Sequence, residues 1–546
     1  MEYKAIISEI DQIVGKYAEV SQGRKPDLLI SLCYLSRNFH NEELVKEAKE
    51  RLKNCDVTER DIEKAVGIIA GADDFRQLVI YGLNYYREST FSDTSSIEMS
   101  KVASELLKFE EGENILDFGC SNGFFIANAA EFCMEHNVNN TEFLGVEVND
   151  YAALTAKMVI ECLRINGKVL TGDYLFEELP EFNKGYLFPS LTDRKRASEY
   201  RSCLFPEMVL SRASYFWHYV DKMLSSVSES GRVVAFVNDG ALFSKPDDPF
   251  RKKLVQSGFV EGLISFPAGI LQYSGVKMSA VVFSRNNKFV KCVDASSMTV
   301  GNTVRYNNLK LDVDQIVRAY NSDAVETVAC EELLKKNSLH VPAILAKEIQ
   351  IKNSVEFREV ANIFPGAQYT IAKFKDHISK KPTGRKIVTS SDINDGIVDW
   401  DNLPYIEWND KFDKYAVEFG DLIITSKSSK VKIAVVDIEP EEKIIVTGGM
   451  LIARITGSLD PTFLKIFLES EIGQSELKSI QKGSYITTMN ASDLLGIKVP
   501  VPEMQFQQQV ANKYNGYLST LYALKEEIKD VENKIKSFYE TEVEGQ

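Results

Sequence analysis

The feature that most constrains the fold of this chain is an alternation of short apolar runs with helical segments between about residues 97 and 285. Strands that are separated by helices pair in parallel and are covered by helices on both faces. The pattern therefore predicts an α/β domain with a mainly parallel sheet. The six runs are NILDFGC (114–120), EFLGVEV (142–148), KVLTGD (168–173), GRVVAFVN (231–238), EGLISFP (261–267) and SAVVFSR (279–285).

The chain has 546 residues, too many for one hydrophobic core, so several domains are expected. Residues 1–80 are predicted to form a helical domain, because NEELVKEAKERLKNC (41–55) and TERDIEKAVGII (58–69) have helical periodicity. The α/β domain is assigned to residues 81–300. Residues 301–350 have a mixed pattern and are expected to be a connector.

The last third of the chain has two further patterns. Alternating strands and turns over residues 351–502 predict a separate, mainly β domain. Residues 503–546 are predicted to form one long helix, because apolar residues recur there at alternating steps of four and three, the seam of a coiled coil. The seam residues are Val510, Tyr514, Tyr517, Leu521, Leu524, Ile528, Val531, Ile535 and Phe538.

Composition narrows the class of protein. The chain is 44% apolar and 26% charged, and it has no apolar run long enough to cross a membrane, so a cytoplasmic protein without membrane contact is expected. Its eight cysteines include no CxxC pair, so neither a disulfide framework nor a metal site is expected. The net charge of −15 argues against binding nucleic acid over the whole surface, but not against a local basic cleft.

A tight turn follows the first predicted strand, in ILDFGCSNGFF (115–125). Asp117 ends the strand, and glycines in the turn let a ligand approach the backbone closely, beside the free N–H groups of a helix start. Alone, the pattern equally suits glycines that serve only the turn geometry. The turn residues concerned are Gly119, Ser121 and Gly123.

Two further acids favour a ligand. Glu147 ends the next strand, 24 residues after Gly123, where a carboxylate accepts hydrogen bonds from both hydroxyls of a ribose. Asp173 ends the third strand, where a carboxylate can accept from an adenine amino group. Because the ends of neighbouring parallel strands meet at one edge of a sheet, the three acids predict a site for an adenosine-containing ligand.

With these residues in place, the chain resembles the S-adenosylmethionine-dependent adenine DNA methyltransferases, in particular the modification subunits of type I restriction systems. The resemblance covers the helical N-terminus, the three strand ends, and SSIEMSKVASELL (95–107), GRVVAFVNDGALF (231–243) and LISFPAGILQYSGVKMSAVVFS (263–284). It implies a Rossmann-like methyltransferase domain that binds S-adenosylmethionine. Ser95 and Ser96 stand where the family usually has Thr-Pro near the methionine part of the cofactor, and the resemblance extends the cofactor site to Ser95.

The family's catalytic signature, Asn/Asp/Ser-Pro-Pro-Tyr/Phe, follows the fourth strand. Aligning FNKGYLFPSL (182–191) with that strand puts Phe188, Pro189, Ser190 and Leu191 at its four positions. The first position supplies a hydrogen-bond acceptor to the amino group of a flipped adenine, and the fourth stacks on the base. Because Phe188 has no acceptor and Leu191 has no ring, methyl transfer is predicted to be impaired or lost.

Two rescues of the missing signature are open at this point. The segment DDPF (247–250) looks like the signature but follows the fifth strand, where the family has a surface loop. Alternatively, a slipped loop would bring Ser190 into the acceptor position.

Residues 355–541 resemble one target-recognition domain of a type I specificity subunit with its following helix, chiefly in FGDLIITS (419–426) and GSYITTMNASDLLGIKVPVPEMQFQQQV (483–510). Basic clusters in IAKFKDHISKKPTGRK (371–386) and SKSSKVK (426–432) suit contacts to DNA phosphates, with solvated loops as the alternative. A tyrosine in a Gly-Ser-Tyr loop is a further candidate, although such a residue also packs. The expected DNA contacts are Lys380, Lys381, Arg385, Lys427, Lys430, Lys432 and Tyr485.

These features predict a fused modification and specificity protein of a restriction-modification or phage-defence system, which binds S-adenosylmethionine and a defined double-stranded DNA sequence. The alternative is a non-catalytic DNA-binding scaffold that needs an active partner. The seam predicts a homodimer through the C-terminal helix; the helix folding back on its own methylase domain and a separate specificity subunit are the alternatives. Restriction or other modification subunits are possible further partners. The chain has no GxxxxGK[ST] phosphate loop, so it is not expected to translocate on DNA by itself.

Overall fold

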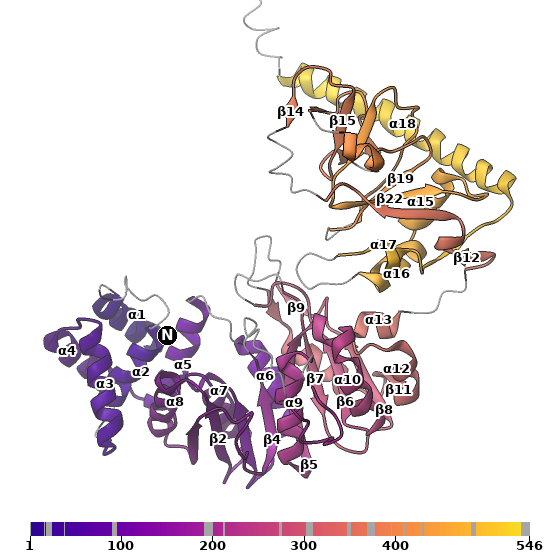
Figure 1. Ribbon diagram of the computed structural model, residues 1–546. Coiled ribbons are helices and arrows are strands. Elements are labelled where there is room, and N and C mark those ends of the chain that lie inside the picture. Colours follow the sequence, from indigo (N-terminus) through magenta and orange to yellow (C-terminus); the bar gives the residue numbers. More distant parts are fainter. Residues whose placement is uncertain are drawn as a thin grey trace, which may run out of the picture. The chain divides into compact units, whose positions relative to one another are not determined.

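The structure is a computed structural model in which the chain divides into two compact units, residues 1–345 and 346–546, each considered by itself (Figure 1). The residues that it describes are 2–15, 17, 25–37, 39–89, 95–189, 200–210, 213–271, 276–301, 309–346, 351–368, 377–394, 396–407, 410–427, 431–481 and 488–536.

The first unit begins with five helices, which confirms the helical expectation for residues 41–69. The five helices are α1 (Glu2–Val14), α2 (Lys25–Leu35), α3 (Glu42–Asn54), α4 (Glu59–Ala70) and α5 (Phe75–Ser89). Side chains cap α3 and α4 at their N-termini. Asn41 accepts a hydrogen bond from the amide of Leu44, and Thr58 accepts one from the amide of Asp61. The apolar faces of these helices share one core, which also includes residues of two helices that flank the sheet, α7 (Phe124–Glu135) and α8 (Asp150–Leu163).

A nine-stranded sheet follows, in the order β11-β8-β6-β7-β5-β4-β1-β2-β3. All six apolar runs are strands of this sheet, as predicted. Five of its eight pairings are parallel; β7 runs antiparallel to β5 and β6, and β11 to β8. The strands are β1 (Asn114–Phe118), β2 (Glu142–Glu147), β3 (Gly167–Thr171), β4 (Phe182–Leu187), β5 (Val227–Asn238), β6 (Val260–Ser265), β7 (Met278–Phe283), β8 (Phe289–Asp294) and β11 (Glu326–Ala329).

Helices cover both faces of this sheet, and neighbouring strand residues point alternately into two cores. Val233 belongs to the core that contains Trp217, and Val234 to the core that contains Phe125. The mainly parallel, doubly covered sheet is thus confirmed. The flanking helices are α6 (Ile97–Leu107), α7 (Phe124–Glu135), α8 (Asp150–Leu163), α9 (Tyr215–Ser226) and α10 (Asp248–Gln256).

Much of the segment expected as a connector, residues 301–350, is part of the first unit. Strand β11 forms the edge of the large sheet, and α11 (Val313–Asn321) buries Ile316 and Tyr320 in the core. The amphipathic spacing of α11 explains why it packs. The remaining elements are β9 (Thr299–Val300), β10 (Lys310–Leu311), α12 (Cys330–Lys336) and α13 (Val341–Leu345).

Within residues 351–502 the described elements of the second unit are mainly strands, and they form two four-stranded sheets, β13-β22-β19-β20 and β14-β18-β15-β21. Their strands are β13 (Ala361–Pro365), β14 (Ile378–Ser379), β15 (Arg385–Val388), β18 (Tyr405–Ile406), β19 (Leu422–Thr425), β20 (Ile433–Val435), β21 (Lys443–Val446) and β22 (Met450–Ile455). Among the described residues, two strand pairs and three helices complete the domain: β12 (Ser354–Glu356), β16 (Ile393–Asn394), β17 (Ile397–Val398), β23 (Lys498–Pro500), α15 (Pro461–Glu469), α16 (Glu471–Ile480) and α17 (Ala491–Leu494).

Helix α18 (Met504–Lys536) leaves this domain as one continuous helix of 33 residues (Figure 1). Its start is fixed to the domain by the fully buried Gln507, which accepts a hydrogen bond from the amide of Asp460 and donates to two backbone carbonyls. Within the described residues, no helix combines the length and apolar character needed to span a membrane.

Candidate functional site

The predicted cofactor residues of the first three strands lie at one edge of the sheet. β1 pairs in parallel with β2, and β2 with β3, so the carboxyl ends of the three strands are neighbours. Glu147 is opposite Thr171, and the amide of Gly172 donates to its carbonyl, which brings Asp173 to the same edge. The structure therefore brings Asp117, Glu147 and Asp173 to one edge.

Glu147 is a half-buried carboxylate held by the backbone on both sides. One oxygen accepts a hydrogen bond from the amide of Ser121 (2.9 Å), and the other from the amide of Asn149 (2.9 Å). These bonds tie the end of β2 to the glycine turn and to the start of α8. The carboxylate is thus preorganised, and lone pairs remain for further donors such as ribose hydroxyls.

Asp117 is a buried carboxyl group with one oxygen that could accept a further hydrogen bond. Its side chain is 3% exposed, and one oxygen, Oδ2, has no hydrogen-bond partner among the described residues. Burial raises the pKa of Asp117 well above its usual range, and the charge of Glu147 raises it further. A ligand that donates a hydrogen bond or carries a positive charge here would relieve this cost.

The turn between β1 and α7 needs its glycines. Gly119 and Gly123 have φ angles of +85° and +82°, which side chains disfavour, and Ser121 also has a positive φ of 48°. A Cβ atom on Gly123 would lie 3.2 Å from the Cα of Ala156 in α8. The turn therefore holds the start of α7 close to the middle of α8, and its residue Ser121 is bonded to Glu147.

Two exposed apolar residues at this edge were missed by the sequence reading. Val148, directly after Glu147, is 68% exposed, and Phe176, three residues after Asp173, is 64% exposed. Asp173 is itself exposed and accepts from the amide of Leu175. Exposed apolar groups beside hydrogen-bonding acids suit a planar heterocycle. The signal available in the sequence was an apolar residue one position after Glu147 and another three positions after Asp173.

Ser95 and Ser96 precede α6. Ser95 is buried, and the hydroxyl of Ser96 caps the helix by accepting from the amide of Met99 (3.2 Å). The hydroxyl of Ser96 therefore has a structural role, while Ser95 stays a candidate for the cofactor site.

The position of the family tetrapeptide follows β4, next to the end of β1. Phe118 is opposite Leu187, the residue before Phe188. The ring of Phe188 is half-buried against the apolar core, with its centroid 6.2 Å from that of Phe236. Pro189 is also half-buried, whereas Ser190 and Leu191 lie outside the described residues, so the slipped-loop alternative is not tested.

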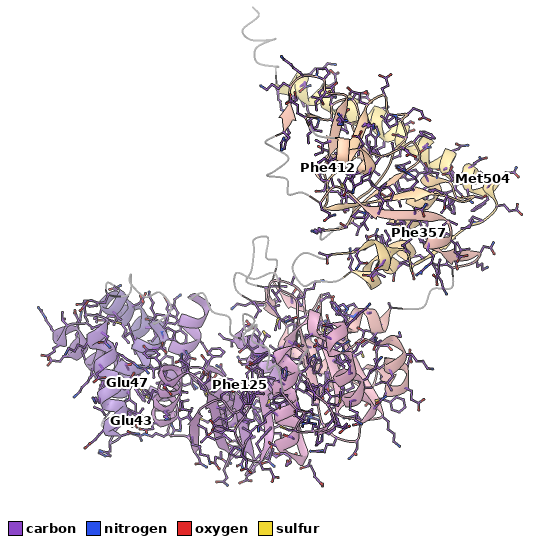
Figure 2. The ribbon with its side chains drawn as sticks, viewed as in Figure 1. Glu43, Glu47, Phe125, Phe357, Phe412 and Met504 are labelled. Atoms are coloured by element: carbon purple, nitrogen blue, oxygen red, sulfur yellow. The ribbon has the colours of Figure 1, made fainter. Side chains whose placement is uncertain are left out.

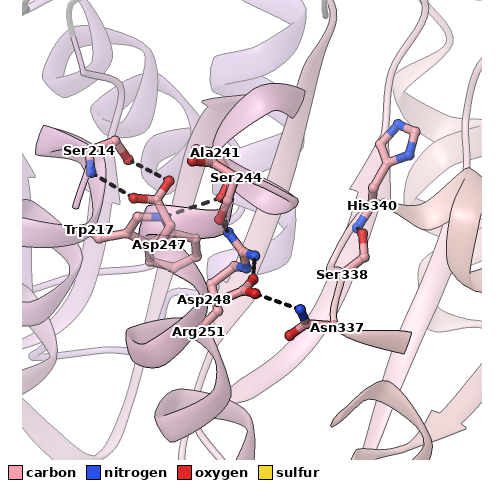
Figure 3. Close-up of polar contacts among 10 residues, drawn as sticks. All are labelled: Ser214, Trp217, Ala241, Ser244, Asp247, Asp248, Arg251, Asn337, Ser338 and His340. Carbon is pink, nitrogen blue, oxygen red and sulfur yellow. Dashed lines mark hydrogen bonds and ion pairs between the residues drawn. The ribbon is translucent and has the colours of Figure 1, made fainter. Parts of the chain in front are cut away.

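The look-alike segment DDPF (247–250) has structural roles (Figure 3). Asp247, 1% exposed, accepts from the amide (2.8 Å) and the hydroxyl (3.2 Å) of Ser214. Asp248 pairs with Arg251 and accepts from Asn337, and Phe250 is buried in the core. Because these groups are used in packing and internal bonds, the segment does not offer a free acceptor for a base.

The candidate DNA contacts in the second unit fall into two groups. Lys380, Lys381 and Lys427 are exposed, and none of them forms an ion pair with a described residue. Arg385 is bonded to Asp413 (2.9 Å), and the ammonium of Lys432 donates to the carbonyls of two residues, Ser390 and Ile393. Lys430 and Tyr485 lie outside the described residues.

The charge of Arg385 is largely compensated within the domain. Asp413 accepts from Arg385 and from Lys443 (2.6 Å), and these two hydrogen bonds lower the pKa of Asp413 to about 2. The exposed lysines therefore have more charge available for phosphates than Arg385 or Lys432.

Comparisons with known proteins found similarity to DNA methylases and to specificity subunits of restriction enzymes. A family model described as N-6 DNA Methylase matches residues 95–348. The chain is 29% identical over 135 residues to the type I restriction enzyme EcoBI specificity subunit of Escherichia coli, covering 24% of this chain and 28% of that protein. It is 22% identical over 189 residues to the MjaVIII specificity subunit of Methanocaldococcus jannaschii, covering 33% and 43%. The chain thus spans less than half the length of these two relatives.

Among solved structures, the methyltransferase subunit of a type I restriction-modification system from Streptococcus thermophilus aligns with a TM-score of 0.44 at 16% identity, over 52% of this chain and 69% of that one. The family model and the two relatives show that the chain resembles both N-6 DNA methylases and type I specificity subunits, as its sequence motifs indicated.

Proposed function

We propose that this protein binds S-adenosylmethionine and a specific double-stranded DNA sequence, as a methyltransferase-like component of a restriction-modification or phage-defence system. The observation that carries the proposal is the group of three acids at one sheet edge, next to a glycine turn with three left-handed residues. The match to N-6 DNA methylases over residues 95–348 covers this edge and supports the choice of cofactor.

The described residues fit this cofactor. Glu147 offers acceptors for the ribose hydroxyls, Asp173 an acceptor for the adenine amino group, and Val148 and Phe176 apolar surfaces for the ring. Asp117 offers an unpartnered acceptor near the site. When bound, the cofactor would supply an activated methyl group; the protein's part is to hold and orient it.

The acceptor side of the reaction is altered. An adenine amino group is a weak nucleophile, and a transferase needs hydrogen-bond acceptors for its two hydrogens. Phe188 offers none, and its half-buried ring packs against the core near Phe236. The protein is therefore proposed to be a divergent transferase with little or no activity. The second candidate is a DNA-binding scaffold that relies on an active partner, which the same alteration favours.

Cofactor binding is expected to depend on Glu147. Replacing it with alanine should weaken S-adenosylmethionine binding by about 1.5–3 kcal/mol, the usual range for hydrogen bonds to a charged group. Glu147→Gln keeps one acceptor and should have an intermediate effect. Isothermal calorimetry on the purified chain measures both.

A matched control lies at the opposite end of the same strand, where Glu142 pairs with Lys168 (3.1 Å). Glu142→Ala should leave the affinity within about twofold, since a surface ion pair contributes little. Equal affinities for Glu147→Ala and Glu142→Ala, or no binding by the unaltered protein, would count against the cofactor site.

DNA binding is expected to depend on the two adjacent exposed lysines. Lys380→Ala with Lys381→Ala should weaken binding to all sequences alike and reduce the slope of log K against log salt by about two, because each phosphate contact contributes about 0.9. Fluorescence anisotropy at several salt concentrations measures the slope.

The control is Lys443→Ala, which removes a lysine whose charge is paired with Asp413. Its salt slope should stay near that of the unaltered protein. If the double substitution also left the slope unchanged, the lysines would be solvated surface residues.

We also propose that two copies associate through α18. From Tyr517 to Ile535 the seam residues are exposed, with fractional exposures from 44% to 70%, and Phe538 lies outside the described residues. A continuous apolar stripe of this kind is unusual on a monomer and marks an interface. A second copy is the proposed partner, because a two-fold axis closes the stripe on itself and gives two recognition domains for two half-sites of an interrupted palindrome.

A further inference from the structure

A buried arginine joins the helical N-terminal region to the α/β sheet. Arg51, in α3, is 3% exposed. Its guanidinium donates to the hydroxyl of Thr155 (2.6 Å) and to the carbonyl of Tyr151 (2.7 Å), both in α8. It also stacks on the ring of Tyr151 at 3.8 Å and pairs with Glu47 (2.7 Å), labelled in Figure 2. The guanidinium therefore binds the first two turns of α8.

The start of α8 is directly linked to the candidate cofactor residue Glu147. Tyr151 lies four residues after Glu147. Between them, Asn149 donates its amide to the carboxylate of Glu147 and caps α8 by accepting from the amide of Ala152. Any shift of the first turn of α8 would therefore move a hydrogen bond that holds Glu147.

Stability alone is a poor reason for an arginine at this place. The N-terminus of a helix has a positive partial charge, which disfavours a nearby cation, and burying a guanidinium is costly even when it is paired. A planar fork of donors, however, fixes position and angle better than apolar packing does. Arg51 uses this fork on Thr155 and Tyr151.

We propose that Arg51 is a positioning residue through which the helical N-terminal region sets the orientation of Glu147 and hence the affinity for the cofactor. The inference rests on the proposed function, since it concerns the same pocket. It assigns the helical region a part in cofactor binding through Arg51, which lies in α3 and reaches Glu147 only by way of α8.

The chain offers a matched control at the other end of α8. There Tyr34, in α2, donates to Glu161 (2.5 Å), so it too ties a fully buried residue of the helical region to α8. Arg51→Lys removes the forked contact to Thr155 and Tyr151, and Tyr34→Phe removes the hydrogen bond to Glu161. Both substitutions keep most of the side-chain volume. Only the first tie lies next to Glu147.

Calorimetry with S-adenosylmethionine should show binding weakened about fivefold or more by Arg51→Lys, within the usual range for coupling between sites, and by less than about twofold by Tyr34→Phe. Thr155→Val removes one partner of Arg51 without removing a charge, and should shift the affinity in the same direction by less. It serves as the second variant if Arg51→Lys folds poorly, which thermal unfolding would reveal.

Hydrogen exchange of the free protein gives a readout that does not need the cofactor. Arg51→Lys should speed exchange in residues 149–155, and Tyr34→Phe should not. Equal effects of the two variants on affinity and exchange would overturn the inference and leave the proposed function standing. Absence of binding by the unaltered protein would contradict the proposed function, and the role of Arg51 with it.

Discussion

Replacing Leu524 and Ile528 with aspartate is expected to turn a dimer into a monomer. These residues are adjacent in the seam and are 51% and 58% exposed on α18. In a dimer they would face the second copy, and the double substitution would place four carboxylates in an apolar interface. Each unpaired buried charge costs several kcal/mol, more than an interface of this length can offset. Sedimentation velocity at micromolar concentration measures the change.

The matched control adds the same charge to the opposite face of the helix. Ser519→Asp with Asn533→Asp places two aspartates at exposed positions outside the seam, and should leave the dimer intact. A monomeric unaltered protein, or a dimer that survives the seam substitutions, would contradict the proposed assembly. A chain ending at Pro502 should also be monomeric.

The charges beside the seam favour antiparallel pairing. Glu527 and Lys534 each precede a seam residue, and Glu532 follows one. In a parallel pair, Glu527 of one copy would face Glu532 of the other, and the two like charges would repel. In an antiparallel pair with Ile528 opposite Val531, Glu527 of one copy lies beside Lys534 of the other. Opposite charges then meet on one flank of the seam.

The structure shortens the seam that the sequence suggested. Val510 packs against the core of its own domain, and the hydroxyl of Tyr514 accepts from the buried Lys465 of α15 (2.8 Å). These two positions are therefore occupied within the domain, and the free stripe starts at Tyr517. A periodic pattern shows which residues share a helix face, but not which part of that face the same chain already covers.

Strand prediction succeeded for the six apolar runs, but it missed β8, in which Val290 and Cys292 are buried beside the exposed Phe289. Strand β4 has no such pattern: its position rested on the family resemblance. It contains the polar residues Asn183 and Lys184, whose partners lie about 70 residues earlier in the sequence. Asn183 accepts a hydrogen bond from the amide of Asn114, and Lys184 forms an ion pair with Glu113 (3.2 Å). Edge strand β11 was missed for a similar reason, because its half-exposed residues ETVA lack an apolar run.

At the candidate site, too, some residues could be predicted from the sequence and others could not. Asp117 and Glu147 could be predicted because their position after apolar strands fixes them at the sheet edge. Val148 was missed, since sequence alone does not show whether an apolar residue after a strand is buried or exposed. Counting charges gave Arg385 and Lys432 the same weight as Lys380, although the first two have partners inside the domain.

Methyl transfer is the second place where a large effect is expected. Removing one preorganised polar contact at a reacting centre typically costs about a hundred- to a thousandfold in rate. Phe188→Asn restores the acceptor at the first position of the tetrapeptide, and Leu191→Phe restores the aromatic ring at the fourth. The double variant should therefore gain transfer activity by at least this factor, provided that the cofactor side of the pocket is intact.

The most direct test of a retained cofactor pocket beside an altered acceptor pocket is one assay with two proteins. Each protein, the unaltered chain or the Phe188→Asn, Leu191→Phe variant, is incubated with methyl-labelled S-adenosylmethionine. The substrate is genomic DNA of the source organism that carries no adenine methylation, and the labelled N6-methyladenine formed is counted. We expect no label above background with the unaltered chain and clear incorporation with the double variant. Incorporation into adenine by the unaltered chain would contradict the account.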